Sequence, residues 1–474
     1  MASAVQDQQK IMRELVTKAA FTQYGKDHHF TEIKSYDDFK KHIPIADYEQ
    51  LKPYIEKIKD GKENVLWPGK PIYFAKTSGT TSGTKYIPIT KESIGNHINS
   101  TKDALLTYIA NSGNADFLNG KMIFLSGSPT LDTSGKIPTG RLSGIVNHHV
   151  PAYLTKNQLP SYETNCIEDW ETKVNKIVDE TIDKDMTLIS GIPPWMQMYF
   201  DKLYERTGKK VIELFPNLSI IVYGGVNFEP YRQRLFESIG KQIDSVELFP
   251  ASEGSFAYQD VQDEKGMLLT TNKGIFYEFI PAEEIFGENP ARLYLKDVEL
   301  NKNYALIINN NAGLWGYNIG DTVKFVSLDP YRVIVSGRIK HFISAFGEHV
   351  IGEEVDASIG EASKKHQAQI SEYTVAPFVA KEEGKSYHEW FIEFEKEPAD
   401  MQSFAEDLDN ELRKRNTYYD DLIAGNILQK LQITRVQKNG FINYMKSVGK
   451  LGGQNKLPRL SNDRAIADEL EKHS

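Results

Sequence analysis

The sequence contains a single cysteine, Cys166, among 474 residues. One cysteine cannot form a disulfide within the chain, and it cannot build a zinc site from several thiolates. The sequence also lacks a run of about 20 apolar residues, which a membrane-spanning helix would need. Its start, MASAVQDQQKIMRELVTKAAF, has no apolar stretch followed by a cleavage site, so no secretory signal is visible. These absences favour a cytoplasmic protein with no membrane partner.

An excess of positive charge is absent as well. The net charge is −9 and the isoelectric point is about 5.8. Non-specific binding to nucleic acid depends on Lys and Arg that displace counterions, so the acidic balance argues against a nucleic-acid partner. The chain is also too long for one hydrophobic core, because single cores stop growing near roughly 250–300 residues. We therefore expect two or three domains.

Several catalytic signatures are missing. The sequence contains no GxGxxG dinucleotide fingerprint, no GxSxG nucleophile elbow, and no HExxH or CxxC motif. The adjacent pairs His28–His29 and His148–His149 lack the spacing of metal ligands, and we interpret them as surface or supporting residues. A dinucleotide enzyme, a serine hydrolase and a thiolate metal site therefore have no support in the sequence.

Helices and strands are predicted to alternate through the first two thirds of the chain. Ile11, Leu15 and Ala19 recur every four residues and predict an amphipathic helix at the start. Short apolar runs that suit buried strands occupy residues 121–129, 186–194, 219–225 and 244–254. Asn227 as N-cap and Pro230 suit the beginning of a helix between the last two runs, and Gly240 suits its end. This strand–helix–strand pattern predicts helix-covered sheets, in which ligands bind at the carboxyl ends of strands.

The pattern of expected strands and helices changes near residue 300. Residues 304–337 read as strands broken by glycines, and the segment after Gly337 reads as a separate α+β unit. That unit has expected strands near 370–378 and 387–395 and an expected helix near 401–414. We therefore predict an N-terminal domain over residues 1–337, a hinge at 338–341 and a C-terminal domain over 342–474.

The most informative stretch is IYFAKTSGTTSGTKYIPIT, residues 72–90. Hydroxyl residues and two glycines fill a loop between two expected strands, and Lys85 closes it. Glycines let a backbone present N–H groups to phosphate oxygens, and hydroxyls add further donors. A polar hairpin loop is the ordinary alternative, but the density of hydroxyls and the lysine favour phosphate binding. Thr84 and Tyr86 flank Lys85, which excludes a Walker A loop.

Four further motifs are weaker when each is taken alone. The FPASEG motif, Phe249–Gly254, lies at the end of an expected strand, where its carboxylate could hold magnesium. The alternative for this motif is a solvated turn. Asp321 of YNIGD could accept hydrogen bonds from ribose hydroxyls, although a turn cap is the commoner role. The segment from Gly337 to Glu348 fits a hinge or a passive linker. Lys456 of GGQNKLPR would by itself be read as a surface lysine.

The order of these five motifs resembles the adenylate-forming superfamily of acyl-CoA synthetases and firefly luciferase. More closely, it resembles the auxin-responsive family of acyl acid amido synthetases, which conjugate jasmonate or auxin to amino acids, and the shorter chain looks like a bacterial branch. The resemblance implies an α/β fold with a large adenylate-forming N-terminal domain and a small, mobile C-terminal domain. It implies an ATP-dependent ligase that adenylates a carboxylic acid and transfers the acyl group to an amine, an amino acid in the family. ATP and Mg²⁺ are the implied cofactors.

Site residues follow from the resemblance position by position. The implied catalytic residues are Lys456, Glu253 and Lys85, with Glu253 also the magnesium ligand. The residues implied to bind the nucleotide or serve the hinge are Ser78, Gly79, Thr80, Thr81, Ser82, Gly83, Thr84, Phe249, Ser252, Tyr317, Asp321, Arg338 and Lys340. Arg141 is a candidate partner for the carboxylate of the acid, or else a surface arginine.

Two substitutions depart from the family pattern, because Phe249 replaces a tyrosine and Asn318 replaces an arginine. They keep a catalytically silent adenine-nucleotide-binding regulatory protein open as an alternative. Formation of a thioester with coenzyme A is the other alternative. The residues do not identify the acid, the amine or the oligomeric state, although a monomer is plausible.

Overall fold

The structure is a computed structural model, which describes residues 3–78, 84–150, 155–225, 228–339, 342–343, 348, 350–380, 386–425, 427–451, 456–461 and 463–473. The chain folds into two compact units. The first unit comprises Met1–Gly225 and Ile243–Val335, and the second comprises Val226–Gln242 and Ser336–Ser474. The expected hinge at 338–341 and the mobility of the C-terminal domain stay predictions.

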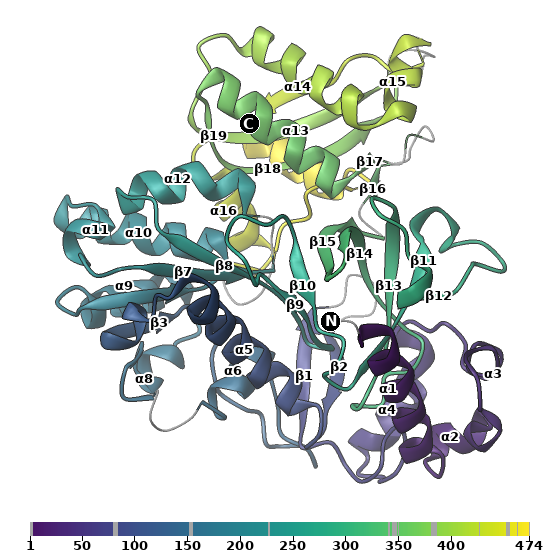
Figure 1. The fold of residues 1–474 in the computed structure, drawn as a ribbon. Helices are drawn as coiled ribbons and strands as arrows, with labels where there is room; N and C mark the ends of the chain where they lie inside the picture. The colour runs from purple at the N-terminus through teal and green to yellow at the C-terminus, as the bar shows by residue number, and fades with distance from the viewer. Residues whose placement is uncertain are drawn as a thin grey trace. The chain divides into compact units, whose positions relative to one another are not determined.

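The chain begins with helix α1 (Ala4–Ala19), as the apolar periodicity predicts. Ile11, Leu15 and Ala19 are all buried, and α1 packs on strand β11 (Ile275–Pro281; Figure 1). Gln8 fixes this packing because its side-chain amide donates to the carbonyl of Ile275 and accepts from the N–H of Tyr277, at 2.8 Å in each case. A polar side chain on the buried face therefore continues the hydrogen bonding of the neighbouring strand.

Further helices of the first unit are α2 (Gln23–Asp27), α3 (Tyr36–His42), α4 (Tyr48–Lys59), α5 (Ile94–Ser112), α6 (Leu142–Asn147), α8 (Tyr162–Asn165), α9 (Trp170–Thr181), α10 (Pro193–Thr207) and α11 (Val211–Leu214). Its strands besides β11 are β1 (Tyr73–Ser78), β2 (Thr84–Ile89), β3 (Lys121–Phe124), β4 (Thr139–Gly140), β5 (Gln158–Leu159), β6 (Met186–Ser190), β7 (Ile220–Gly224), β8 (Asp244–Ala251), β9 (Gly254–Tyr258), β10 (Met267–Leu269), β12 (Leu293–Tyr294), β13 (Asn303–Asn310), β14 (Tyr317–Leu328) and β15 (Tyr331–Arg338), which runs past the unit boundary.

The main sheet formed by the described residues has the order β12-β11-β13-β14-β15-β10-β9-β8-β7-β6-β3-β5. Strands β5, β3, β6, β7 and β8 run parallel, as predicted for strand–helix–strand units. The four predicted buried runs are confirmed as β3, β6, β7 and β8. Helix α5 covers one face of this parallel part, where Ala104 and Tyr108 join a core with Leu188, Val222 and Val246 (Figure 1). From β8 to β9 the pairing becomes antiparallel, so the parallel part ends at β8.

The second unit contains α12 (Glu229–Ile239), β16 (Phe342–Ile343), β17 (Val350–Ile351), α13 (Gly352–His366), β18 (Gln369–Phe378), β19 (Tyr387–Lys396), α14 (Met401–Arg415), α15 (Thr417–Ala424), β20 (Gln432–Arg435), α16 (Gly440–Ser447) and α17 (Ala465–Leu470). The expected strands and helix of this region are confirmed as β18, β19 and α14. Phe404, Leu408 and Leu412 of α14 are completely buried against Trp390 of β19 and its neighbours.

Helix α12 begins and ends close to the predicted positions, and Gly240 caps it at φ +86°. Glycine suits this left-handed conformation, because a side chain there would be strained. The expected N-cap residue, Asn227, lies outside the described residues. Although α12 connects β7 to β8 along the chain, it packs on α13 and β18 and belongs to the second unit.

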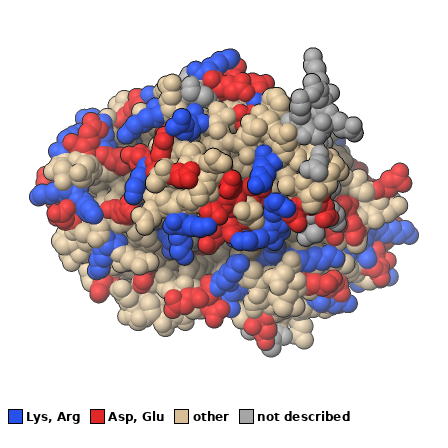
Figure 2. Space-filling model, turned by 90° about the horizontal axis from the view of Figure 1, so that it is seen from above, with Lys and Arg blue, Asp and Glu red and all other residues tan. Residues whose placement is uncertain are grey.

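The surface carries both signs of charge. Figure 2 shows Lys and Arg interspersed with Asp and Glu over the face that it presents. Searching the helices of the described residues finds none that is both long enough and apolar enough to cross a bilayer. The absence of a nucleic-acid partner stays a prediction.

Candidate active site

The hydroxyl-rich motif lies on a β-hairpin, as its flanking apolar segments predict. Strands β1 and β2 pair antiparallel, with Ser78 opposite Thr84 and Thr77 opposite Lys85. Thr84 is exposed at the start of β2, and Lys85 is half-buried behind it. The remaining predicted phosphate-loop residues, Gly79, Thr80, Thr81, Ser82 and Gly83, lie outside the described residues.

Lys85 lies over the aromatic ring of Tyr48, the first residue of α4. Its Nζ is 5.7 Å from the ring centroid, within the range of a cation–π interaction. The Tyr48 hydroxyl accepts a hydrogen bond of 2.9 Å from the backbone N–H of Tyr86 on β2. Asp47 caps α4 by accepting from the N–H groups of Glu49 and Gln50. The start of α4 therefore supports the hairpin strand that carries Lys85.

The residue before this helix cap connects α4 to the Tyr-Asn-Ile-Gly-Asp motif. Ala46 and Tyr317 form a parallel bridge, in which the N–H of Ala46 donates to Gly316 and the N–H of Asn318 donates to Ala46, each at 2.8 Å. Gly316 has φ +54°, and a Cβ placed on it would lie 2.1 Å from the carbonyl oxygen of Pro44. Only glycine allows the two segments to approach this closely.

Tyr317 in turn connects this motif to Glu253 of the Phe-Pro-Ala-Ser-Glu-Gly motif. Tyr317 is 1% exposed, and its phenol lies close enough to Glu253 to respond to the charge of that carboxylate. Burial, and then the charge of Glu253, raise the pKa of Tyr317 well above its ordinary value. The phenol therefore stays protonated beside the carboxylate. Three motifs that are far apart in the sequence meet through these contacts.

Glu253 lies in the tight turn between β8 and β9, which also holds Ser252. The turn is fixed by two asparagines from elsewhere in the chain. The side-chain amide of Asn310 donates to the carbonyl of Glu253 at 2.8 Å. Asn96 of α5 accepts from the N–H of Ser255 at 2.7 Å and donates to its carbonyl at 3.1 Å. Bonds on both sides of the turn therefore hold the backbone that presents the Glu253 carboxylate.

Asp321 lies within a β-bulge in β14. The register with β13 shifts between Ala305 and Ile307, which pair with Thr322 and Asn318, and Gly320 adopts φ +87° at this point. Asn318, which replaces the expected arginine, accepts a hydrogen bond of 2.9 Å from the N–H of Gly320. Bulges of this kind redirect the side chains that they carry. Asp321 is 9% exposed, and its ribose-binding role stays a prediction.

Phe249 is part of the hydrophobic core of the first unit. Its ring is 5% exposed and packs edge-to-face on Phe256, with centroids 5.1 Å apart. This packing explains why the position tolerates phenylalanine, because a tyrosine hydroxyl buried here would need a partner. An adenine contact would use the remaining exposed edge, and that contact stays a prediction.

Arg141 follows β4, which pairs parallel with β1 so that Gly140 lies opposite Ala75. The expected carboxylate-binding residue therefore lies one residue beyond the strand that borders the hairpin. Its side chain runs beside the segment after β3, because a Cβ on Gly127 would lie 2.9 Å from Arg141 Cδ. The partnership with a substrate carboxylate stays a prediction.

A buried lysine lies near Arg141 and was not predicted. Lys173 of α9 is 2% exposed and donates to the carbonyls of Ser126 and Asn165 at 2.8 and 2.7 Å. Burial lowers its pKa to about 8, with Cys166 opposing and Arg141 reinforcing the shift. Two backbone carbonyls therefore satisfy the ammonium group and join α9 to the segment after β3. Nothing in the local sequence distinguishes this lysine from a surface lysine.

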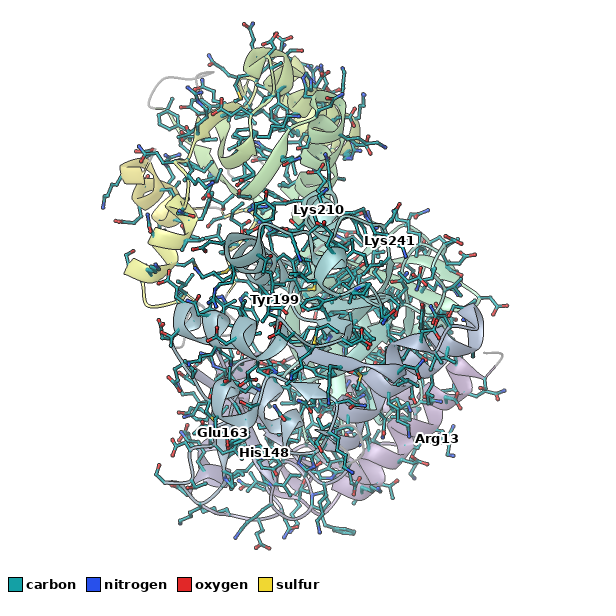
Figure 3. The ribbon with its side chains drawn as sticks, turned by 90° about the vertical axis from the view of Figure 1, so that its left-hand side faces the viewer. Arg13, His148, Glu163, Tyr199, Lys210 and Lys241 are labelled. Carbon is teal, nitrogen blue, oxygen red and sulfur yellow. The ribbon has the colours of Figure 1, made fainter. Side chains whose placement is uncertain are left out.

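The histidine pair at 148–149 lies on the outside of the same region. His148 is exposed, donates from Nε2 to the carbonyl of Pro129 at 2.8 Å, and lies on the same side of the molecule as Glu163 (Figure 3). His149 contacts the hydroxyl of Tyr73 at 3.2 Å. The interpretation of these residues as surface or supporting residues agrees with these contacts.

The remaining predicted residues belong to the second unit. Arg338 is exposed at the end of β15, and Lys456 is exposed before a segment that pairs with β18. Lys340 lies outside the described residues. The roles of all three stay predictions.

A magnesium ion would have to be held without a cage of protein ligands. Within the residues that the structure describes, no group of three His, Cys, Asp or Glu side chains is placed to bind a metal. Mg²⁺ is often bound by one or two carboxylates together with substrate phosphates and water. A single carboxylate, Glu253, on the turn that Asn310 and Asn96 hold, fits this mode of binding.

The sequence did not predict the residues that connect the motifs, chiefly Tyr48, Asn96 and Asn310. Asp47 and Gln50 form a capping box, which would have predicted where α4 begins. It would not have predicted that Tyr48 contacts β2, because that contact depends on the tertiary fold.

Comparisons with known proteins cover most of the chain. Three models of the GH3 family match this chain. The model of the N-terminal domain matches residues 1–164, that of the central domain matches 268–336, and that of the C-terminal domain matches 353–465. A jasmonoyl–L-amino acid synthetase, JAR4 of Nicotiana attenuata, is 25% identical over 354 residues, which are 60% of this chain and 60% of that synthetase. The indole-3-acetic acid-amido synthetase GH3.3 of Arabidopsis thaliana is 23% identical, with 98% of this chain and 90% of that protein covered.

Solved structures show the same fold. The GH3.15 acyl acid amido synthetase has a TM-score of 0.80 at 15% identity and covers 99% of this chain and 94% of its own. A 2-hydroxyisobutyryl-CoA ligase in the postadenylation state has a TM-score of 0.62 at 12% identity, with 98% and 91% covered. The expected α/β fold with a large N-terminal and a smaller C-terminal part is confirmed by these likenesses.

Proposed function

The chain belongs to the GH3 family, and on that premise we propose that it is an ATP-dependent acyl acid amido synthetase. It adenylates a carboxylic acid and then transfers the acyl group to an amine. Two of the relatives named above are a jasmonoyl–L-amino acid synthetase and an indole-3-acetic acid-amido synthetase, and the second aligns with nearly the whole chain. The expected membership of this family is confirmed, whereas the bacterial origin stays a prediction.

In the first step, a carboxylate oxygen of the acid attacks the α-phosphorus of ATP. The bond between the α-phosphorus and the bridging oxygen breaks, and pyrophosphate leaves with the electron pair. The product is an acyl adenylate, whose leaving group, AMP, is far better than the oxide of a free carboxylate. Negative charge builds on phosphate oxygens during this step, so donors fixed near those oxygens accelerate it.

The residues that we assign to this step follow the contacts of the first unit. The hairpin presents Lys85 and the hydroxyl-rich turn to the phosphates, and Asp321 binds the ribose hydroxyls. Glu253 would hold Mg²⁺, which when bound to the phosphates neutralises part of their charge. Ser252 and Phe249 border the adenine. Arg141 pairs with the carboxylate of the acid.

One observation carries the proposal: Lys85, Glu253 and Tyr317 are connected through residues 46–48. Lys85 lies over Tyr48, the segment before Tyr48 pairs with the segment that holds Tyr317, and Tyr317 lies close to the charge of Glu253. A regulatory protein would need only the nucleotide contacts. A lysine in the second unit, at the position of the family's catalytic lysine, supports an enzyme that turns over.

In the second step, the amine attacks the acyl carbon of the adenylate. The bond between that carbon and the phosphate oxygen breaks, AMP leaves, and the nitrogen loses a proton to form the amide. The named relatives use amino acids as the amine. An amino acid is therefore the amine that we propose here.

ATP–pyrophosphate exchange with a panel of acids tests the first step. The panel includes indole-3-acetate, jasmonate and 2-hydroxyisobutyrate, the acids that the relatives' names suggest. Exchange that depends on one of these or a similar acid supports the proposal. Absence of exchange with every acid, combined with absence of ATP binding in calorimetry, would remove it.

The acceptor is tested by product mass. Each reaction receives either the twenty amino acids or coenzyme A, and the product is weighed by mass spectrometry. An amide mass supports the proposal. A thioester mass, formed without an amide, would favour the acyl-CoA ligase alternative.

Lys456→Ala separates the two steps. Because Lys456 is assigned to the charge that builds on the α-phosphate during adenylation, we expect this variant to lose exchange by about 100- to 1,000-fold, the usual effect of removing one such donor. Amide formation from a presynthesised acyl adenylate should be retained. Equal loss of both steps would contradict the role of Lys456.

A further inference from the structure

The segment that carries Lys456 is attached to the second unit by backbone hydrogen bonds. Residues 458–461 continue beside β18, where the N–H of Val375 donates to the carbonyl of Arg459 at 2.9 Å and the N–H of Ser461 donates back to Val375 at 3.0 Å. The Thr374 hydroxyl donates to the carbonyl of Pro458 at 2.8 Å. Leu460 is fully buried in the core of the unit. Leu457, the residue after Lys456, packs on the neighbouring core of the unit, so the attachment follows Lys456 directly.

Arg459 adds a second, side-chain attachment at the same place. Its guanidinium carbon lies over two aromatic rings, 4.4 Å from the centroid of Tyr373 and 5.3 Å from that of Tyr231. It donates to Glu372 and to the hydroxyl of Tyr231, and its Nε lies 3.8 Å from Asp356. The side chain is 15% exposed. Its partners come from α12, α13 and β18, so one arginine connects three elements of the unit.

The partners are themselves connected, which fixes the position of the guanidinium. The Tyr231 hydroxyl lies 3.2 and 3.3 Å from the two carboxylate oxygens of Glu372. The Tyr373 hydroxyl donates to Asp356. A planar guanidinium that donates to Glu372 and to Tyr231 while it lies over two rings is held in a narrow range of orientations.

Holding the segment in place does not by itself require this arrangement. The backbone bonds and the burial of Leu460 already attach residues 458–461 to β18. Buried ion pairs often contribute little net stability, because desolvation of the charges offsets their attraction. The property that such a cluster adds is a defined geometry. Lys456 lies three residues before Arg459, so its Cα stays within roughly 11 Å of the Arg459 Cα.

We propose that Arg459 is a positioning residue for Lys456, and that its contacts with Tyr231, Glu372 and Tyr373 fix the backbone from which Lys456 acts. This inference rests on the proposed function, because it assigns Arg459 to the adenylation step that Lys456 serves. Arg459 does not contact the reacting atoms in this account. It acts through the geometry of the segment that follows Lys456.

The test compares Arg459→Gln and Arg459→Lys with Arg464→Gln. Arg464 is a matched control, because it lies in the same unit, is 21% exposed, donates to Glu389 at 2.8 Å and stacks on Phe378 at 5.4 Å. Three quantities are measured for each variant. They are kcat and KM for ATP in pyrophosphate exchange, the rate of amide formation from a presynthesised acyl adenylate, and the rate at which a lysine-specific protease cleaves after Lys456.

We expect Arg459→Gln to lower kcat of exchange by about 100-fold, the typical effect of misplacing a catalytic group by about 1 Å. KM for ATP and amide formation from the adenylate should change less than about twofold, because Lys456 serves only the first step. Cleavage after Lys456 should become several times faster. Arg459→Lys should show the same pattern, since lysine cannot donate in two fixed directions. Arg464→Gln should leave all three quantities near those of the unmodified protein.

Normal exchange by Arg459→Gln would overturn the inference, and so would an equal loss in Arg464→Gln or equal loss of both half-reactions. If Arg459→Gln does not fold, Tyr231→Phe removes one contact of the guanidinium and should show a smaller loss of the same kind. Absence of exchange in the unmodified protein with every acid is a different outcome. It would remove the proposed function and this role together.

Discussion

Replacing Tyr317 by phenylalanine removes one oxygen atom and leaves the ring in place. The ring is 1% exposed, so its packing should not change. Burial and the charge of Glu253 raise the pKa of the Tyr317 phenol well above its ordinary value, so the phenol is protonated at every working pH and able to donate a hydrogen bond to the carboxylate. We expect the substitution to remove this hydrogen bond and to loosen the orientation of Glu253.

The size of the effect follows from this hydrogen bond. A hydrogen bond to a charged acceptor contributes about 1.5–3 kcal/mol. Glu253 is half-buried, so water can replace part of the lost bond, and we expect the lower part of this range. A loss of about 1.4 kcal/mol in the transition state corresponds to about tenfold in rate. Tyr317→Phe should therefore lower kcat of pyrophosphate exchange about tenfold and raise the Mg²⁺ concentration needed for half-maximal exchange.

Tyr277→Phe is the matched control. Tyr277 is completely buried on β11, and its hydroxyl donates to the carbonyl of Thr270 at 3.1 Å. This neutral bond contributes about 0.5–1.5 kcal/mol to stability and does not involve Glu253. The control should unfold more easily and exchange at the normal rate. Unchanged exchange and unchanged Mg²⁺ dependence in Tyr317→Phe would refute the reasoning, as would an equal loss of exchange in both variants.

Two further predictions concern stability. Gly316→Ala should lower the free energy of unfolding in urea several times more than Gly320→Ala. Both glycines have positive φ, which costs an alanine about 1–2 kcal/mol, but only the Cβ at position 316 would meet a backbone oxygen, at 2.1 Å. Equal losses of stability would contradict the close approach at Gly316. Burial raises the pKa of Tyr54 and Tyr108 to about 12, above the ordinary 10, so their contribution to stability is present below pH 10 and lost between pH 10 and 12. The urea midpoint should fall across that window as the ultraviolet signal of ionised tyrosine appears, and a midpoint that stays constant to pH 12 would contradict this prediction.

The elements were predictable where the pattern is local. The four-residue repeat of Ile11, Leu15 and Ala19 predicted α1, and short apolar runs predicted the parallel strands, because burial of one face or of both faces leaves a periodic trace in the sequence. The hydroxyl-rich hairpin was predictable for the same reason, since apolar segments border it on both sides. Gly240 marked the end of α12 because the left-handed conformation favours glycine.

The contacts between motifs were not predictable in this way. Tyr48 supports β2 and lies beside the segment that holds Tyr317, but its own neighbours in the sequence show only the start of a helix. Lys173 resembles any lysine of an amphipathic helix until the fold buries it. The grouping of α12 with the second unit depends likewise on Tyr231, whose partners lie far away in the chain. Contacts between residues that are far apart in the chain leave no periodic pattern in the local sequence.

Transfer of isotopic oxygen tests the central claim most directly. The acid that supports exchange is prepared with both carboxylate oxygens isotopically heavy and is incubated with ATP, Mg²⁺ and the accepting amino acid. If the carboxylate attacks the α-phosphorus, each AMP gains one heavy oxygen and each amide keeps the other. Heavy oxygen in inorganic phosphate, or AMP without heavy oxygen while the amide forms, would contradict activation through an acyl adenylate.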